Sequence, residues 1–366
     1  MTADDARFMR RALRLAARGL GRVEPNPMVG CVIVRRGRIV AEGYHRRFGG
    51  PHAEVEALRR CEDPRGCTAY VTLEPCCFFG KTPPCTEALI AAGVRRVVAA
   101  MTDPHPRVRG RGLRRLRQAG IETEAGLLEA EARRLNAAYL KLIRRRQPWV
   151  ILKWAQSLDG RIATRRGDSK WITDEACRQH AHRTRAIVDA IIVGVGTVLA
   201  DDPLLTCRLV RPRRTATRIV LDSHLRTPVK ARIVRTARQV PTWIVCSNRA
   251  PATRAAALER AGCKIVRLAG RAGRPDLSRL LALLGERAMT RVLVEGGGRV
   301  LGSFFDAGLF DEVHAYVAPR LIGGAEAPGP LEGRGVARVR DAAELSVQRV
   351  ARLGRGWVIL STAGRA

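Results

Sequence analysis

The chain has 366 residues, 46% of them hydrophobic, and its 66 basic against 34 acidic side chains give a net charge of +32. That length suits two domains better than one, and the hydrophobic content is sufficient for both cores. Only six of the 66 basic residues are lysine, and the arginines are spread over every segment without the aromatic residues that stack on bases. The charge therefore favours a general arginine bias over a nucleic-acid surface, and we expect no nucleic-acid partner.

The cysteine content and the N-terminus predict where the protein works. Ten cysteines in a chain this long do not form the dense pattern of a small secreted domain. Asp4, Asp5 and Arg7 interrupt the N-terminus, where a signal peptide would have an apolar core. No apolar run approaches the ~18 residues of a membrane span. We therefore expect a reduced, cytoplasmic protein with no membrane partner.

The first 140 residues follow an α/β pattern. Thr2 and Asp5 predict the cap of an amphipathic helix that runs to Ala16. Beyond it, short β-rich runs alternate with helical patterns, which predicts a sheet with helices on both faces. We expect strands at 29–34, 38–43, 69–73 and 96–101. We expect one helix that begins at Ala53, a second from near Pro84 to Gly93, and a third that ends near Gly120.

A charged stretch that ends in proline, 144–148, separates this pattern from a second α/β series. We place the domain boundary there, which gives domains 1–146 and 147–366. The region 324–340 is rich in glycine and proline and predicts loops. In the second series we expect strands at 149–157, 190–194, 218–222, 242–247, 264–268, 291–297 and 312–319.

The motif PHAEV, 51–55, places His52 and Glu54 two residues apart at the start of a predicted helix. They lie about 200° apart around the helix, so they can meet only in a pocket in front of its N-terminus. Downstream, Cys76 and Cys85 each follow a proline. One imidazole and two thiolates around Zn²⁺ leave a fourth position open for water, and Glu54 is suited to carry its proton. The pattern predicts a zinc deaminase centre of the H-x-E and P-C type, although eight residues separate these cysteines, not two.

Several alternatives stay open at this site. Cys77 could replace Cys76 as a ligand, and Cys61 or Cys67 could close a purely structural site as a fourth ligand. His45 and His105 we interpret as surface or pocket residues, not as ligands.

Four motifs resemble the bifunctional deaminase–reductase family of riboflavin biosynthesis. They are PNPMVGCVIV (25–34), HAEVEAL (52–58), TLEPCCFFGKTPPC (72–85) and TDPHPRVRGRG (102–112). The resemblance implies a cytidine-deaminase-like α/β/α sandwich in which zinc is bound by His52, Cys76 and Cys85. It further implies that Glu54 is the catalytic proton carrier and that Asn26 lines the pyrimidine pocket.

One residue departs from the family's pattern. The family usually carries a histidine at the second position after the first cysteine, whereas this chain has Phe78. We expect this change to affect substrate affinity or specificity and to leave zinc binding intact, because no ligand is lost.

Glycines mark a second candidate site. The stretch 291–304 is a predicted strand that ends in Glu295, followed by three glycines and a helix. Such a junction lets a phosphate approach backbone N–H groups at the positive end of the helix, although a turn without ligand fits it too. The stretch 194–199 begins like G-x-G-x-x-G but lacks the third glycine, so a Rossmann site is weakly supported and a tight turn is equally compatible.

The second half resembles the reductase domain of the same family in the segments 153–163, 169–173, 194–208 and 317–319. The resemblance implies a dihydrofolate-reductase-like α/β fold that uses NADPH. The implied cofactor contacts are Ala155, Trp171, Thr197, Asp201, Ser223 and a loop of Gly297, Gly298, Arg299, Val300, Leu301, Gly302 and Ser303. The implied substrate contacts are Ser169, Arg185, Leu205, Arg208 and Glu295.

Further expectations concern catalysis in this half. The two arginines suit a sugar phosphate, which guanidinium groups bind in a bidentate manner. Lys153 and Asp201 are predicted as a catalytic pair at the reacting ribose. His180 and His182 lie in a polar stretch and are expected to face solvent.

Together these expectations describe an enzyme with two activities and a small phosphorylated pyrimidine as substrate. Zinc-dependent deamination is followed by NADPH-dependent reduction of the ribosyl chain to ribityl, in a homo-oligomer that pairs through its reductase domain. The alternatives are a nucleoside or RNA deaminase fused to an accessory domain, and a basic nucleic-acid-binding protein with structural zinc.

Overall fold

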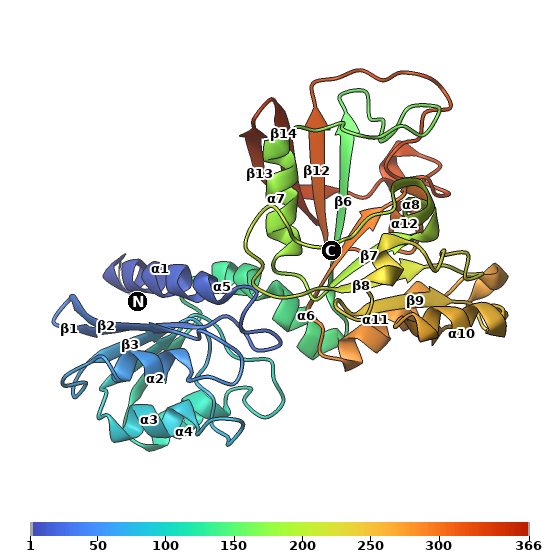
Figure 1. Cartoon of the computed structure of the whole chain (residues 1–366). Coiled ribbons are helices and arrows are strands. Elements are labelled where there is room, and N and C mark those ends of the chain that lie inside the picture. The colour runs from blue at the N-terminus through green and yellow to red at the C-terminus, as the bar shows by residue number, and fades with distance from the viewer. Residues whose placement is uncertain (1–2, 365–366) are drawn as a thin grey trace. The chain divides into compact units, whose positions relative to one another are not determined.

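The computed structural model describes residues 3–364, and the chain divides between Arg146 and Gln147 into two compact units (Figure 1). Each unit has its own sheet and its own core. Within residues 3–364, no helix combines the length and the apolar character needed to cross a membrane.

The first unit is a five-stranded sheet with six α-helices. Its strands are β1 (Gly30–Arg35), β2 (Arg38–Tyr44), β3 (Thr68–Val71), β4 (Arg96–Ala99) and β5 (Glu122–Ala125). Its helices are α1 (Ala3–Ala16), the 3₁₀ turn η1 (Ala17–Gly19), α2 (Ala53–Leu58), α3 (Cys85–Ala91), α4 (Arg111–Gln118), α5 (Glu129–Leu135) and α6 (Ala137–Arg145).

Helices cover both faces of this sheet, whose strand order is β2-β1-β3-β4-β5 (Figure 1). Side chains of β1 alternate between the two faces. Val32 and Val34 pack in one cluster with Phe8 of α1, whereas Cys31 and Ile33 pack in the other, which includes residues of α2, α3 and α4. The sheet thus fixes α2 and α3 on the same face, and the contacts between these two helices follow from it.

The second unit is a nine-stranded sheet. Its strands are β6 (Trp149–Ser157), β7 (Ala190–Gly194), β8 (Thr217–Leu221), β9 (Thr242–Cys246), β10 (Lys264–Arg267), β11 (Arg291–Gly296), β12 (Glu312–Ala318), β13 (Leu345–Leu353) and β14 (Gly356–Ala363). Its α-helices are α7 (Glu175–Arg185), α8 (Val195–Asp201), α9 (Arg232–Arg235), α10 (Ala252–Arg260), α11 (Leu277–Glu286) and α12 (Gly298–Asp306). Two 3₁₀ turns complete it, η2 (Arg271–Gly273) and η3 (Val339–Asp341).

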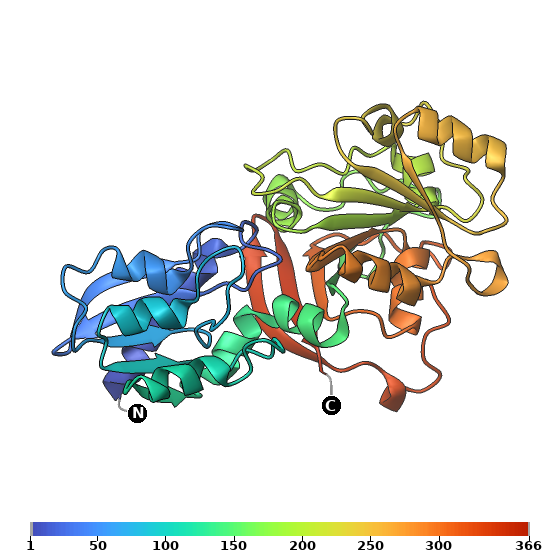
Figure 2. The same cartoon turned by 90° about the horizontal axis from the view of Figure 1, so that it is seen from below.

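The strand order of this sheet is β10-β9-β8-β7-β11-β6-β12-β14-β13. All neighbours from β10 to β12 are parallel, and their near-continuous apolar sequences fit strands with both faces buried. Figure 2 shows helices on both sides of it. The parallel strands β7, β8 and β11 end on one edge, and they bring the segments after Gly194, Leu221 and Gly296 to that edge.

Most predicted strands are confirmed, with ends shifted by a few residues. The antiparallel hairpin β13–β14 was not anticipated, and neither was β5. The predicted helix to Ala16 is confirmed, but Thr2 lies outside the described residues. The predicted capping pair therefore stays a prediction, and the buried carboxylate of Asp5 accepts hydrogen bonds from Tyr70 and Arg96.

The close packing of α2 on β2 leads to a first prediction. A Cβ on Gly43 would lie 2.4 Å from the backbone oxygen of Ala53 and 2.4 Å from the backbone nitrogen of Ala57. Gly43→Ala must push α2 off the sheet, and we expect a loss of about 1–3 kcal/mol in the free energy of unfolding, as for other overpacked sites. Denaturant unfolding measures it. Gly80→Ala is the control, because its Cβ would meet only one atom at an ordinary 3.5 Å; equal stability of the two variants would contradict the prediction.

Two candidate active sites

The first site lies where α2 and α3 begin. His52 is the residue before α2 and Cys85 is the first residue of α3, while Cys76 belongs to the preceding loop. Nδ1 of His52 lies 3.2 Å from Sγ of Cys85 and 3.5 Å from Sγ of Cys76. The three ligand atoms all lie within 4.8 Å of one another. Nδ1, and not Nε2, is therefore the imidazole nitrogen that faces the two sulfur atoms.

The chemistry of this donor set fits a zinc ion. Hydrogen bonds from the thiol of Cys85, from its backbone N–H at 3.3 Å and from His52 lower the pKa of the Cys76 thiol. A thiolate is the form that coordinates metal, and Zn²⁺ favours sulfur and imidazole nitrogen. In the described part of the chain, no fourth histidine, cysteine or acidic residue joins this group. The three residues could thus hold zinc and leave one position for a ligand that is not protein.

Glu54 stands beside this group without belonging to it. The residue is 3% exposed, at the second position of α2. Burial raises the pKa of Glu54 to about 7, although the charge of His52 acts against it. A carboxyl group in that range can both take and return a proton near neutral pH.

Asn26 is held in place by a histidine. Its Nδ2 donates to Nε2 of His45 at 3.2 Å, and Nδ1 of His45 donates to the carbonyl oxygen of Pro51 at 2.9 Å. His45 is 2% exposed, and its ring lies edge-on to that of His52, with 5.3 Å between centroids. His45 is therefore a buried residue that links Asn26 to the segment before His52, a contact that the sequence alone did not reveal.

The positions of the alternative cysteines argue against them as ligands. Sγ of Cys77 points to the backbone oxygen of Arg107 at 3.6 Å, and Cys61 and Cys67 do not belong to the ligand group. The ring of Phe78 stacks on His105 with 5.8 Å between centroids, and the guanidinium of Arg107 lies 4.0 Å from its centre.

The second site is built around a buried ion pair. The Glu295 side chain at the end of β11 is 4% exposed and accepts two hydrogen bonds of 2.6 Å from Arg185 of α7. Lys153 of β6 approaches the same carboxylate to 3.9 Å. Burial would raise the pKa of Glu295, but the charges of Arg185 and Lys153 outweigh it and lower that pKa to about 2. Glu295 is thus ionised and aligned at the centre of the site.

The segment after α8 joins this centre through threonine. The backbone oxygen of Thr206 accepts from Arg185 at 3.3 Å, and its hydroxyl oxygen accepts from Arg208 at 2.9 Å. Leu205 is buried with a φ of 50°, and Arg208 is exposed. The structure therefore brings four predicted substrate contacts together, Arg185, Leu205, Arg208 and Glu295.

The expectation that His180 and His182 face solvent is wrong. His182 is 7% exposed and its Nδ1 accepts from the backbone N–H of Arg208 at 2.9 Å. Nδ1 of His180 lies 2.8 Å from the hydroxyl of Tyr316. The segment 206–209 and strand β12 cover helix α7. The polar sequence of the helix does not reveal that these distant segments bury it.

The glycine-rich junction after β11 is confirmed, but the predicted loop to Ser303 is mostly helical, because α12 begins at Gly298. Gly297 has a φ of 71°, and a Cβ on it would lie 3.4 Å from the hydroxyl of Thr197. The remaining members of the predicted segment, Arg299, Val300, Leu301 and Gly302, belong to α12. The structure thus places Thr197 of α8 against the junction, at the edge where the parallel strands end.

Other predicted cofactor contacts are spread more widely. Ala155 lies in β6, and the Ser223 backbone oxygen just beyond β8 accepts from Ser247. Asp201 pairs with Lys170 at 3.5 Å, and no described interaction links it to Lys153, its predicted catalytic partner. The structure therefore keeps Lys153 at the Glu295 centre and Asp201 apart from that ion pair.

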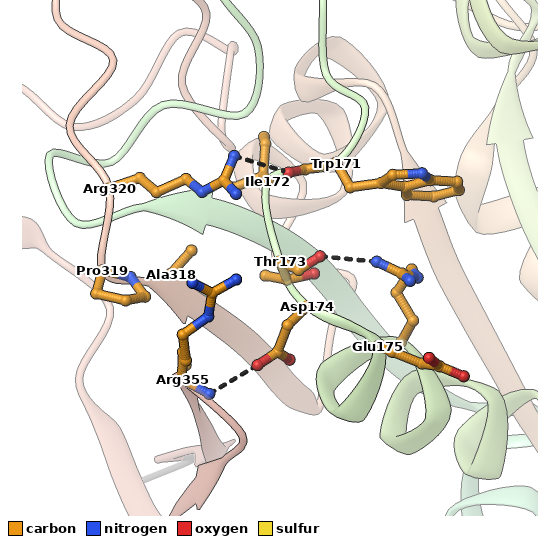
Figure 3. Close-up of a pocket in the computed structure, with 11 residues that line it drawn as sticks. Trp171, Ile172, Thr173, Asp174, Glu175, Ala318, Pro319, Arg320 and Arg355 are labelled. Carbon is orange, nitrogen blue, oxygen red and sulfur yellow. Dashed lines mark hydrogen bonds between the residues drawn. The ribbon is translucent and has the colours of Figure 1, made fainter.

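Trp171 lines a cavity of about 320 Å³ at the N-terminal end of α7 (Figure 3). Its side chain lies under the guanidinium of Arg178, 4.6 Å from the ring centre, and its backbone oxygen accepts from Arg320 at 3.2 Å. Ser169 lies two residues before it and is partly buried.

Comparison with known proteins decides the family. The model of the RibD C-terminal domain matches residues 148–359, and the model of the zinc-binding region of cytidine and deoxycytidylate deaminases matches residues 2–101. The chain belongs to the RibD family. Its N-terminal domain is of the cytidine deaminase type and its C-terminal domain is the RibD reductase domain, so the protein is an enzyme of riboflavin biosynthesis with two activities.

Full-length relatives and solved structures agree with this. Riboflavin biosynthesis protein RibD of Actinobacillus pleuropneumoniae is 43% identical over 96% of this chain and 94% of its own length. The RibD protein of Escherichia coli K12 is 43% identical over 96% of this chain and 97% of its own length. The structure of Acinetobacter baumannii RibD, 37% identical, superposes with a TM-score of 0.87 over 99% of both chains. A diaminohydroxyphosphoribosylaminopyrimidine deaminase/5-amino-6-(5-phosphoribosylamino)uracil reductase of Thermotoga maritima, 36% identical, gives 0.85 over 99% of both.

The orientation of Cys76 and Cys77 predicts how much zinc the protein retains when each is replaced. Cys76→Ser should lose most of its zinc on dialysis against a chelator, because it removes one of three clustered donors. Cys77→Ser should keep zinc like the unmodified protein, since its sulfur points to the Arg107 carbonyl. Plasma emission spectrometry of the purified variants measures this, and zinc loss from Cys77→Ser alone would reverse the assignment.

Proposed function

We propose that the chain converts 2,5-diamino-6-(5-phosphoribosylamino)pyrimidin-4-one in two steps. The N-terminal domain, 1–146, replaces the 2-amino group by oxygen from water and releases ammonia. The C-terminal domain, 147–366, then reduces the ribosyl group to ribityl with NADPH. The observation that carries this proposal is the group of His52, Cys76 and Cys85 with Glu54 beside it, in one chain with the RibD C-terminal domain.

In the deaminase domain, each residue has a distinct task. His52, Cys76 and Cys85 hold zinc, which when bound activates a water molecule for attack on the pyrimidine. Glu54 takes the proton from that water and returns it to the amino group, so that the C2–N bond breaks with neutral ammonia as product. Asn26, oriented by His45, holds the pyrimidine ring through its side-chain amide.

In the reductase domain, the protein supplies binding and alignment. NADPH, when bound, supplies the hydride to C1′ of the ribose, while the bond from C1′ to the ring oxygen breaks and that oxygen gains a proton. The substrate contacts are Ser169, Arg185, Leu205, Arg208 and Glu295, with the phosphate near the two arginines. Lys153, held beside Glu295, stands at the reacting ribose and is the stronger candidate for the proton, because Asp201 pairs elsewhere.

Some of the proposed cofactor contacts, Thr197, Ser223 and the segment from Gly297, lie at the edge where the parallel strands end. The proposed residues are Ala155, Trp171, Thr197, Asp201, Ser223 and the segment from Gly297 to Ser303. The start of α12 suits a phosphate of the cofactor, since backbone N–H groups and the positive end of a nine-residue helix face it.

The alternatives receive less support. A nucleic-acid-binding protein with structural zinc needs a closed metal site, whereas the donor group among the described residues has three members. A nucleoside or RNA deaminase with an accessory domain does not account for relatives that match both halves of the chain.

The edge of the second sheet supports a homo-oligomer. Among the described strands β13 pairs only with β14, and Val347 and Val350 on it are 58% and 61% exposed. An open edge strand with exposed valines is a common pairing surface. We propose that a second copy of the chain covers this edge. All ten cysteines are free thiols, which fits a cytoplasmic enzyme.

Glu54→Gln tests the division of labour. The amide cannot take a proton, so ammonia release should fall by at least about 10²-fold. Zinc content and oxidation of NADPH with the deaminated substrate should stay within about threefold of the unmodified protein, because Glu54 contributes to neither. Ammonia and NADPH are followed in separate assays. Loss of both activities in a folded, zinc-loaded variant would refute the proposal.

Charged residues at the open edge test the oligomer. The double variant Val347→Lys and Val350→Lys should be monomeric where the unmodified protein is not, because lysines on an edge strand prevent pairing. Light scattering after size-exclusion chromatography gives the mass. Val339→Lys, at a residue that is 92% exposed in η3, is the control and should keep the oligomer. A lysine double variant with unchanged mass would exclude this edge.

A further inference from the structure

His182 is a buried histidine that none of the chemistry above uses. It lies on α7, three residues before Arg185, and is 7% exposed. The segment that carries Arg208 lies against it, since the thiol of Cys207 also donates to the backbone oxygen of His182 at 3.4 Å. The residue therefore lies between the two arginines proposed to bind the substrate phosphate.

The hydrogen bonds of His182 fix its state. Nδ1 accepts from the backbone N–H of Arg208 at 2.9 Å and from that of Leu209 at 3.3 Å. A ring nitrogen that accepts carries no proton, so the neutral ring has its hydrogen on Nε2. Nε2 lies 3.5 Å from Nη1 of Arg185, at the outer limit of a hydrogen bond. With the hydrogen on Nε2 two donors face each other there, so this contact is not a hydrogen bond, and the two bonds to Nδ1 decide the tautomer. A protonated ring would lose the two acceptor bonds and place a positive charge next to a guanidinium.

The charged groups around the ring act in the same direction. Arg185 on its own helix, Arg208 on the covering segment and Lys153 on β6 are cationic and lower the pKa of His182, whereas Glu295 on β11 raises it. Burial, followed by the charges of Arg185 and Arg208, lowers the pKa of His182 to about 4. The ring is neutral throughout the physiological range.

We infer that His182 is a positioning residue of the reductase site, whose neutral imidazole anchors the backbone of Arg208 so that Arg208 and Arg185 are presented together to the substrate phosphate. The inference deepens the proposed function and rests on it. Thr206 completes the frame, because it accepts from both arginines. Without the imidazole, the backbone N–H groups of Arg208 and Leu209 would lose their acceptor. The 206–209 segment would then be released, while Arg185 stayed paired with Glu295.

Two substitutions distinguish the loss of the hydrogen-bond acceptor from the loss of the imidazole ring itself. His182→Leu removes the acceptor, and we expect KM for the deaminated substrate to rise about tenfold, the effect of leaving a buried donor unpaired. Its kcat should change less than about threefold, because Lys153 and Glu295 are untouched. His182→Asn puts an amide oxygen where Nδ1 lies and should restore KM to within about threefold. A Leu variant with unchanged KM, or an Asn variant as impaired as Leu, would overturn the inference.

Arg183→Gln and Arg208→Ala are the controls. Arg183 is exposed on the same helix, so its substitution should change neither constant. Arg208→Ala should raise KM, and His182→Leu should add little to it in the double variant, since both act through one side chain. An unchanged KM in Arg208→Ala would refute the proposed phosphate contact itself, whereas an effect of Arg208→Ala without any effect of His182→Leu would refute only the positioning role.

Nuclear magnetic resonance gives a readout that does not depend on activity. With ¹⁵N-histidine labelling, the signal absent from His182→Asn should show a protonated Nε2 and an unprotonated Nδ1, unchanged from pH 8 to pH 5.5. A ring that carries its hydrogen on Nδ1, or that titrates near the ordinary pKa of about 6.5, would overturn the inference. If His182→Leu fails to fold, this spectrum and the His182→Asn variant still test the positioning role of His182.

Discussion

The convergence of one nitrogen and two sulfur atoms is the constraint on which the first domain depends. His52 comes from the segment that enters α2, and the two cysteines come from a loop and a helix start more than twenty residues later. They meet because β1 and β3 place α2 and α3 on the same face of the sheet, with both helices starting toward one point. A donor set of this kind can hold zinc and leave room for water, and we propose that the buried carboxyl group of Glu54 moves the proton of that water.

The second domain depends on a buried carboxylate and the cations around it. Its centre is a carboxylate, Glu295, that stays ionised in a buried place because Arg185 and Lys153 surround it. The excess of positive charge suits the phosphate contact that we propose, and His182 adds none because it is held neutral. The arginine-rich composition contributes elsewhere as well: the fully buried Arg218 donates only to neutral oxygen atoms, among them Leu204 beside the substrate segment.

Sequence reasoning predicted the group of three candidate zinc ligands because its information is local. His52 and Glu54 share one motif, and Cys76 and Cys85 share another, so residue type and spacing predicted the group that the structure brings together. The parallel strands were equally visible as continuous apolar runs. Family, fold and cofactors followed from long motifs in both halves, and the relatives agree with them.

What sequence reasoning missed depends on contacts between distant segments. The polar sequence of α7 suggested solvent around His182, yet the 206–209 segment covers it. The strand β13 escaped notice because its side chains are exposed on both faces, which removes the alternation that marks a half-buried strand. The pairing of Asp201 with Lys170, and not with Lys153, likewise depends on a loop that no local pattern places.

The central claim is that three protein atoms hold the metal and leave one position to a ligand from outside the chain. X-ray absorption at the zinc edge of the purified protein tests it most directly. The account predicts two sulfur neighbours and one imidazole nitrogen, with a single light atom that is not histidine to complete the shell. A shell of four protein donors, such as three sulfurs and one imidazole, would contradict it.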